Sequence, residues 1–112
     1  MTDNLQLYNS IHNCDPWEES FEKSLREYNF IEPKKAWKNI LTLSRQSNFE
    51  GLFPGFIKSF IKTIGSSYNP DLALNNFERF TETIEDKNYL YTILYNSQET
   101  LKSLIVLFSG SQ

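Results

Sequence analysis

Apolar residues recur every three or four positions along most of this chain, which is the spacing of one buried face of an α-helix. The pattern covers residues 17–28, 34–46, 55–64, 69–84, 87–95 and 97–108, and no segment alternates for long enough to be a strand. The sequence therefore predicts an all-α fold of about six helices with short connections. We expect these helices to pack as stacked antiparallel hairpins, in a bundle or a short HEAT-like array.

The first of these helices has the most complete start signal. Asp15 and Pro16 open it, with Asp15 as the cap and Glu18 three residues on, as in a capping box. Further along, Glu22 and Arg26 are a favourable pair four residues apart. The sequence therefore predicts a helix that begins at residue 17.

Proline marks the next three helix starts as well, at Pro33, Pro54 and Pro70. The start at Pro33 is poorly charged, because Lys34 and Lys35 face the positive end of the helix dipole. At the start at Pro70, Asn69 can cap and Asp71 places a negative charge beside that positive end.

Two further helices follow. Asp86 can cap the fifth, and either Asn96 or Ser97 can cap the sixth, which ends just before Gly110. The apolar face expected of the fifth helix consists of the pairs Tyr89/Ile93 and Leu90/Leu94. The face expected of the sixth consists of Leu101, Leu104, Ile105 and Phe108.

Residues 1–14 lack this pattern and are expected to be a frayed leader, whereas residues 15–112 form a single helical domain. His12, the only histidine, and Cys14, the only cysteine, lie in the leader. Their spacing is not a metal-ligand motif, and one cysteine cannot form an internal disulfide. We therefore expect no metal site and no need for an oxidising compartment.

Two adjacent asparagines interrupt the helical pattern of residues 69–84. A weak internal repeat, at an offset of 37, places Asn39 and Asn76 at the same position, one residue before a large apolar residue. An amide there can reach a neighbouring helix end and satisfy its free backbone groups. The alternative is a ligand contact from Asn75, with Arg79 one turn further on. Asn75, Asn76 and Arg79 are therefore the candidate structural or contact residues.

The charge balance excludes one class of function. The 112 residues carry 11 basic and 14 acidic side chains, a net charge of −3, and the excess of acid lies in residues 63–112. A nucleic-acid binder needs a surplus of lysine and arginine, which this chain lacks. The longest apolar run, residues 104–108, is too short to span a membrane, and the N-terminus has no signal-peptide pattern. We expect a cytoplasmic protein that binds neither nucleic acid nor membrane.

The sequence contains no catalytic motif. Its four glycines are too scattered to form a phosphate loop, and Cys14 has no base placed near it by the sequence. Glu78, Glu82, Glu85 and Asp86 are expected to form an outward polar surface rather than a carboxylate pair for acid–base catalysis. The aromatic residues, 15% of the chain, are expected in the core.

One part of the chain resembles a known family. Residues 73–80, Ala-Leu-Asn-Asn-Phe-Glu-Arg-Phe, and residues 104–111, Leu-Ile-Val-Leu-Phe-Ser-Gly-Ser, are similar to two phrases in the helical N-terminal region of the glutamine synthetase adenylyltransferases. These bacterial enzymes attach AMP to a tyrosine of glutamine synthetase and remove it. The likeness covers residues 70–112, and residues 1–69 contain no motif that we can place.

The resemblance implies a non-catalytic scaffold or docking segment in nitrogen regulation. Members of the family continue into a nucleotidyltransferase domain, whose Gly-Ser and Asp-x-Asp residues hold ATP and Mg²⁺. In this chain Gly65-Ser66 and Asp71 superficially match that signature, but Ala73 stands in place of the second carboxylate, so no catalytic residue is carried over. We then expect the N-terminal part of a longer protein, with no cofactor of its own. The implied partners are glutamine synthetase or an adjoining nucleotidyltransferase domain.

Two other functions stay open. A free-standing helical adaptor would bind a protein or peptide along an exposed apolar stripe, and an exposed apolar edge would also favour self-association. A small enzyme would need a pocket with converging titratable groups, and we consider it the weakest of the three.

Overall fold

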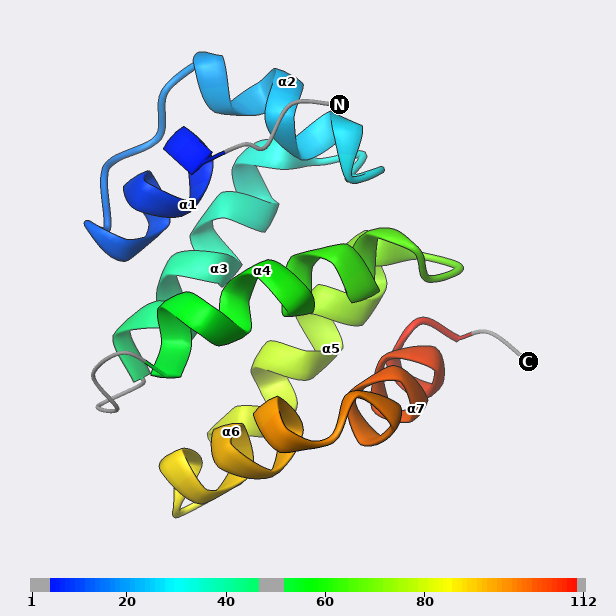
Figure 1. Ribbon diagram of the computed structural model, residues 1–112. Helices are drawn as coiled ribbons and strands as arrows, with labels where there is room; N and C mark the ends of the chain where they lie inside the picture. Colours follow the sequence, from blue (N-terminus) through cyan, green and yellow to red (C-terminus); the bar gives the residue numbers. More distant parts are fainter. Residues whose placement is uncertain (1–4, 47–51, 111–112) are drawn as a thin grey trace.

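Seven helices and no strand make up the part of the chain that the structure describes, residues 5–46 and 52–110 (Figure 1). In this computed structural model the helices are α1 (Leu5–His12), α2 (Ser20–Glu27), α3 (Pro33–Gln46), α4 (Leu52–Gly65), α5 (Pro70–Glu82), α6 (Lys87–Asn96) and α7 (Gln98–Phe108). The all-α prediction is confirmed, with one helix more than the six expected. Together the helices measure 34 × 33 × 25 Å.

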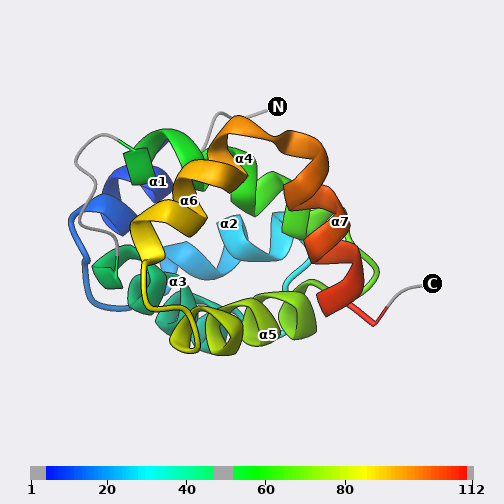
Figure 2. The same cartoon turned by 90° about the horizontal axis from the view of Figure 1, so that it is seen from below.

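Helix α5 lies between α3 and α7 and makes its most extensive contacts with these two helices. Helix α2 packs on α3, while α4 contacts α5, α6 and α7. In Figure 1, α1 and α2 lie at the top of the molecule and α6 and α7 at the bottom. Seen from below, α5, α6 and α7 surround the lower end (Figure 2). Helices α3, α4, α5 and α7 therefore make most of the contacts between helices in the described chain.

Aromatic rings fill the centre of the core, as the composition predicts. Phe77 of α5 is fully buried, and its ring centroid lies 4.8 Å from that of Phe60 in α4. Phe56, one turn earlier in α4, lies 5.6 Å from the ring of Tyr91 in α6. Such pairs contribute about 0.5–1.5 kcal/mol each beyond the burial of their area. They connect three consecutive helices, α4, α5 and α6.

The expectation of a frayed leader is wrong for residues 5–12, which form α1. Leu7 and Ile11 are buried, and the helix packs against both α3 and α4. The hydroxyl groups of Tyr8 and Tyr28 share a hydrogen bond of 2.5 Å, which ties α1 to the end of α2. A helix of eight residues is stabilised by tertiary packing rather than by its own propensity, so periodicity alone did not reveal it. Residues 1–4 of the expected leader lie outside the described residues.

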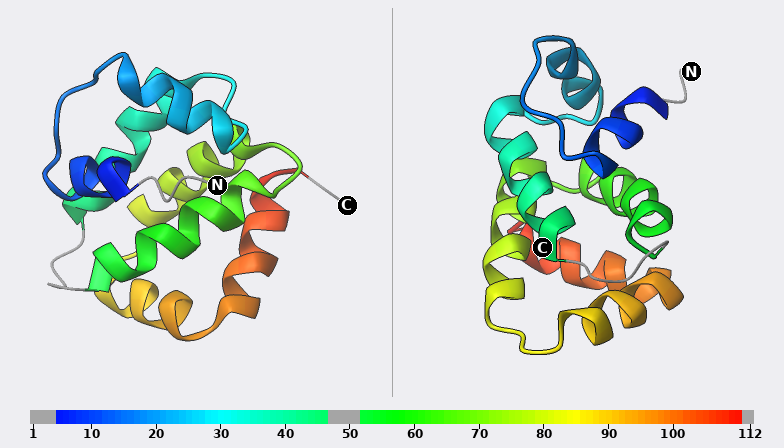
Figure 3. Two further views of the ribbon diagram at one scale, coloured as in Figure 1. Left: turned by 45° about the horizontal axis from the view of Figure 1, so that its top comes forward. Right: turned by 90° about the vertical axis from the view of Figure 1, so that its left-hand side faces the viewer.

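The start expected for the first predicted helix is also wrong. Helix α2 begins at Ser20 instead of residue 17, and Glu19 precedes it without a side-chain capping bond. Asp15 serves a different purpose, because its backbone carbonyl accepts a hydrogen bond of 3.0 Å from Nε1 of Trp37 in α3. The chain has to cross from the end of α1 to the start of α2, as Figure 3 shows, so the connection overrides the local capping signal. Further along, the predicted pair of Glu22 and Arg26 is present at 3.0 Å.

Helix starts later in the chain follow the sequence more closely. Helices α3 and α5 begin at Pro33 and Pro70, and Oδ1 of Asn69 accepts a hydrogen bond of 3.2 Å from the amide of Leu72. Helix α4 begins at Leu52, two residues before the predicted start at Pro54. Local signals therefore place these starts to within two residues.

Gly65, at the end of α4, allows this helix to approach α2 closely. A Cβ atom at this position would lie 2.9 Å from the backbone oxygen of Tyr28, which is too close for any side chain. Nδ2 of Asn29 donates a hydrogen bond of 2.8 Å to the carbonyl of Gly65. Asn29 itself has a φ of 72°, a left-handed conformation that asparagine tolerates better than most residues. The ends of α2 and α4 are thus held together.

The predicted caps of the last two helices are confirmed, but the predicted apolar face of α6 is wrong in part. Asp86 caps α6 through the amide of Tyr89, and Ser97 caps α7. Tyr91 and Leu94 form the buried side of α6, whereas Tyr89 is exposed. Apolar residues lie on more than one side of α6, and packing against α4 and α7 selected the side that is buried.

Candidate interaction surface

Asn76 bridges two helices. Its Nδ2 donates a hydrogen bond of 2.9 Å to the backbone carbonyl of Phe108, the last residue of α7. This carbonyl belongs to the last turn of a helix, where no partner is available within the helix itself. This is the contact that we expect if Asn76 is a structural residue that satisfies a free backbone group at a neighbouring helix end. Asn39, its counterpart in the proposed repeat, makes no side-chain hydrogen bond to the described residues.

Asn75 and Arg79 are not joined to a neighbouring element in this way. Asn75 is half-buried, and it makes no side-chain hydrogen bond within the described part of the chain. Arg79 is exposed, and its positive charge acts on neighbouring Glu78. A ligand contact from Asn75 and Arg79 therefore stays a prediction.

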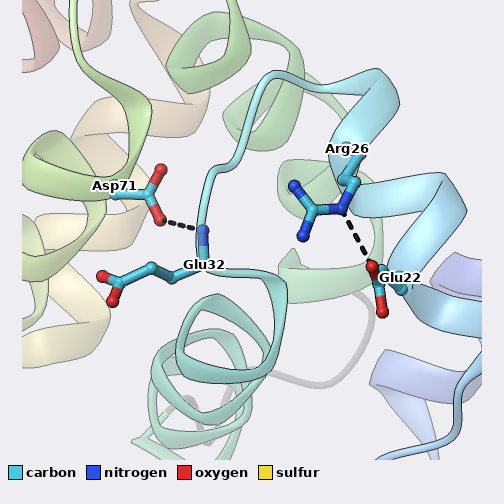
Figure 4. Close-up of polar contacts among 4 residues, drawn as sticks. All are labelled: Glu22, Arg26, Glu32 and Asp71. Atoms are coloured by element: carbon cyan, nitrogen blue, oxygen red, sulfur yellow. Dashed lines mark hydrogen bonds and ion pairs between the residues drawn. The ribbon is translucent and has the colours of Figure 1, made fainter.

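Asp71 makes a contact between helices that the sequence did not predict. Its Oδ1 accepts a hydrogen bond of 2.7 Å from the amide of Ile31. Its Oδ2 accepts one of 3.0 Å from the amide of Glu32, which Figure 4 shows. Both amides lie just before α3, which has no acidic residue in its first turn. Asp71, at the start of α5, therefore supplies the carboxylate that the start of α3 lacks.

Glu78, Glu82 and Tyr91 form a polar cluster between α5 and α6. Burial, followed by a hydrogen bond with Glu82 and the negative charge of Glu82, raises the pKa of Glu78, while Arg79 acts in the opposite direction. Burial and the charge of Glu78 raise the pKa of Tyr91. The neutral hydroxyl of Tyr91 donates to Oε1 of Gln46 at 3.3 Å, so this cluster links α3, α5 and α6.

Large apolar side chains are exposed mainly on the last two helices. Eight such side chains occur among the described residues, and five of them belong to α6 and α7. These five are Tyr89, Ile93, Tyr95, Val106 and Leu107. Contiguous exposed apolar surface is typical of protein–protein contact sites, and within this set Tyr89 and Ile93 lie one turn apart on α6. The remaining three, Ile31, Tyr68 and Leu72, lie near the starts of α3 and α5.

Tyr89 and Ile93 are one turn apart on α6, so they form a continuous strip that we call the α6 ridge. Tyr89 is 66% exposed and Ile93 is 38% exposed. The sequence identified this pair as apolar and correctly spaced. It could not show that the pair faces away from the core.

Three exposed carboxylates precede the α6 ridge. Glu82, Glu85 and Asp86 lie between the last residue of α5 and the cap of α6, and we call them the acidic corner. The neighbouring cation, Lys87, donates its Nζ to the carbonyl of Ile84 at 3.0 Å. Within the described residues none of the three carboxylates forms an ion pair. All three are exposed, although Glu82 also interacts with Glu78 and Asp86 also accepts the hydrogen bond from the amide of Tyr89.

No group of three or more His, Cys, Asp or Glu side chains in residues 5–46 and 52–110 is arranged to hold a metal ion. Over the same ranges, no helix has both the length and the apolar character needed to cross a membrane.

The chain matches no protein-family model, no curated protein and no solved structure. The resemblance to the glutamine synthetase adenylyltransferases therefore rests on the quoted residues alone, and what it implies remains a proposal.

Proposed function

We propose that this protein is a non-catalytic helical docking domain, which binds a protein partner through the exposed apolar side chains of α6 and α7. The observation that supports this function is the concentration of such side chains on the last two helices. A free-standing adaptor requires an exposed apolar stripe, and the α6 ridge has the right spacing. A cytoplasmic location is part of the same proposal.

The proposal includes a finer description of the fold. The contacts of α5 with α3 and α7 suit a short HEAT-like array, in which the second helices of successive hairpins lie side by side. In such arrays each repeat buries its apolar face against its neighbours, so the last hairpin has one uncovered face. Helices α6 and α7 are the last hairpin of the described chain, and their exposed side chains agree with this position.

The resemblance suggests a more specific form of this role as a second candidate. The chain would be the N-terminal scaffold or docking segment of a protein similar to a glutamine synthetase adenylyltransferase. It would contact glutamine synthetase or an adjoining nucleotidyltransferase domain, and ATP and Mg²⁺ would belong to that domain. Val106 and Leu107 favour this candidate, because they lie in the family-like phrase of α7 and are 46% and 72% exposed. Another element would cover them in the complete protein.

A capture experiment with matched variants tests the docking function. The chain is immobilised and exposed to bacterial lysate supplemented with purified glutamine synthetase and a nucleotidyltransferase domain of the resembled family. Tyr89→Ser and Leu107→Ser each remove an exposed apolar side chain from the proposed surface. Tyr68→Ser is the control, because Tyr68 is 78% exposed but precedes α5.

A partner that is retained by the wild-type chain and by Tyr68→Ser, but lost from either of the other variants, supports docking through α6 and α7. Equal capture by all four proteins would exclude this surface. If the captured partner is glutamine synthetase or the transferase domain, the second candidate is supported. If a folded chain captures neither of them, the second candidate fails while the adaptor function remains.

A further inference from the structure

Helix α6 has apolar side chains on two sides, and the core covers only one of them. Tyr91 and Leu94 are each 1% exposed and pack inward, whereas Tyr89 and Ile93 form the exposed α6 ridge. A helix that is apolar on more than one side is normally covered on each of them. The ridge is therefore a surface that is suited to a second helix.

Charge at one end of the ridge restricts the kind of helix that suits it. The acidic corner contributes three exposed carboxylates just before α6, and they outnumber the one neighbouring cation, Lys87, which donates a hydrogen bond to the carbonyl of Ile84. A partner without lysine or arginine could not neutralise the negative charge of the acidic corner when it binds beside it. Complementary charge across an interface accelerates association and excludes partners of like charge.

We propose that α6 docks a basic amphipathic helix of a partner protein. The apolar stripe of that helix packs on Tyr89 and Ile93, and lysine or arginine side chains beside the stripe meet the acidic corner. Anchors on such a helix recur at three- and four-residue spacing. The inference rests on the proposed docking function and adds the chemistry of the partner.

A second copy of the chain does not satisfy this surface. In an antiparallel contact between two copies of α6, the acidic corner of one would face the C-terminal end of the other. Residues 88–101 contain no lysine or arginine, so the facing copy of α6 contributes no cation there from its own residues. A contact between the two α6 helices alone would therefore leave the acidic corners unneutralised.

A synthetic helix tests the inference directly. The probe is a fluorescently labelled amphipathic peptide of about 18 residues, or about five turns, with leucine at three- and four-residue spacing and lysine elsewhere. A second peptide carries glutamate in place of every lysine. Binding to the full chain is measured by fluorescence anisotropy. We expect the lysine peptide to bind, the glutamate peptide not to bind, and salt to weaken the binding.

Matched variants separate a specific site from a general attraction between opposite charges. Glu82→Lys with Glu85→Lys reverses two carboxylates of the acidic corner, whereas Glu18→Lys with Glu27→Lys makes the same change in net charge beside α2. We expect the first pair to weaken binding about tenfold or more, and the second pair to change it about twofold or less. Tyr89→Ser should weaken binding, and Tyr68→Ser should not. Circular dichroism of each variant verifies that it is folded.

Each outcome has a distinct meaning. Equal losses from the two charge-reversal pairs would overturn the inference, since binding would then depend only on net charge. Binding of both peptides with equal affinity would overturn it too. Analytical ultracentrifugation tests whether a second copy of the chain binds the α6 ridge instead. A dimer that is abolished by Tyr89→Ser would assign the ridge to a second copy and overturn the inference. If the capture of a protein from lysate requires Tyr89 but not Glu82 and Glu85, the docking function is supported, whereas the inference of a basic partner is overturned.

Discussion

At the scale of single residues, Asn76 shows how a poor helix former is retained inside a helix. Its amide satisfies the carbonyl of Phe108 in the last turn of α7. Its neighbour Asn75 is equally unfavourable for a helix and lacks such a contact within the described residues. The two adjacent asparagines therefore form an internal comparison.

We predict that Asn76→Ala lowers the free energy of unfolding by about 1–3 kcal/mol, because the Phe108 carbonyl then loses its partner. Asn75→Ala is the control and should leave stability nearly unchanged. Urea denaturation followed by circular dichroism measures both. If the unfolding transition of Asn76→Ala superimposes on that of the wild type, the hydrogen bond does not contribute to the free energy of unfolding.

The raised pKa of Glu78 leads to a prediction about pH. The folded chain holds this proton more tightly than the unfolded chain, so ionised Glu78 opposes folding above its raised pKa. This unfavourable contribution is lost as the pH falls through the raised pKa towards the ordinary value of 4.5. We expect Glu78→Gln to melt at a higher temperature than the wild type at neutral pH, with a difference that shrinks towards about pH 4.

Thermal melts of the two proteins between about pH 4 and pH 8 provide the comparison. Glu18→Gln is the control, because Glu18 is exposed and lies outside the polar cluster. A stability difference for Glu78→Gln that is constant over this range would contradict the prediction.

At the scale of helices, two acidic residues occupy equivalent local positions but have different surroundings. Asp71 and Glu99 are each the second residue of a helix, after a cap at Asn69 or Ser97. Both interact favourably with the helix dipole, but Asp71 also accepts the amides of Ile31 and Glu32. A comparison of the two isolates the contact between the starts of α3 and α5.

We predict that Asp71→Ala costs about 1–2 kcal/mol of stability, because two charge-assisted hydrogen bonds are lost. Glu99→Ala should cost about 0.3–1 kcal/mol, which is the contribution of the dipole alone. Chemical denaturation of both variants supplies the values. Equal losses would mean that the contact of Asp71 with the start of α3 adds nothing to stability.

Local capping signals predicted a helix start correctly only where no contact with a distant helix determined the path of the chain. Asn69, Asp86 and Ser97 cap the helices that the sequence assigned to them. Asp15 does not, because its carbonyl binds Trp37 and the chain there must connect α1 to α2. A cap involves residues two or three positions apart, whereas the direction of a connection depends on helices that are distant in sequence.

At the scale of the whole molecule, α1 extends the domain to residues that the sequence pattern had left out. Ile11 is 1% exposed, and α1 lies against both α3 and α4. We predict that Ile11→Ala costs about 2–5 kcal/mol, as expected for truncation of a buried side chain. His12→Ala, at an exposed position, should cost little. If the midpoints of urea denaturation agree for both variants, α1 is not part of the cooperative unit.

The candidate surface could be predicted from sequence only in its parts. The spacing of Tyr89 and Ile93 and the acidity of the C-terminal half are visible in the sequence. The exposure of the ridge is not, because Tyr91 and Leu94 offer a second apolar side of the same short helix. Which side is buried depends on α4 and α7, and periodicity within one helix contains no information about them.

The sequence by itself determined the helical class, most of the helix boundaries and the caps of α5, α6 and α7, because these depend on interactions within a few residues. Tertiary structure decided that residues 5–12 fold as α1, that Asp71 serves α3 as well as α5, and that the α6 ridge faces outward. Each of these features depends on segments that are far apart in the chain. Their stability comes from packing between helices, which no local pattern encodes.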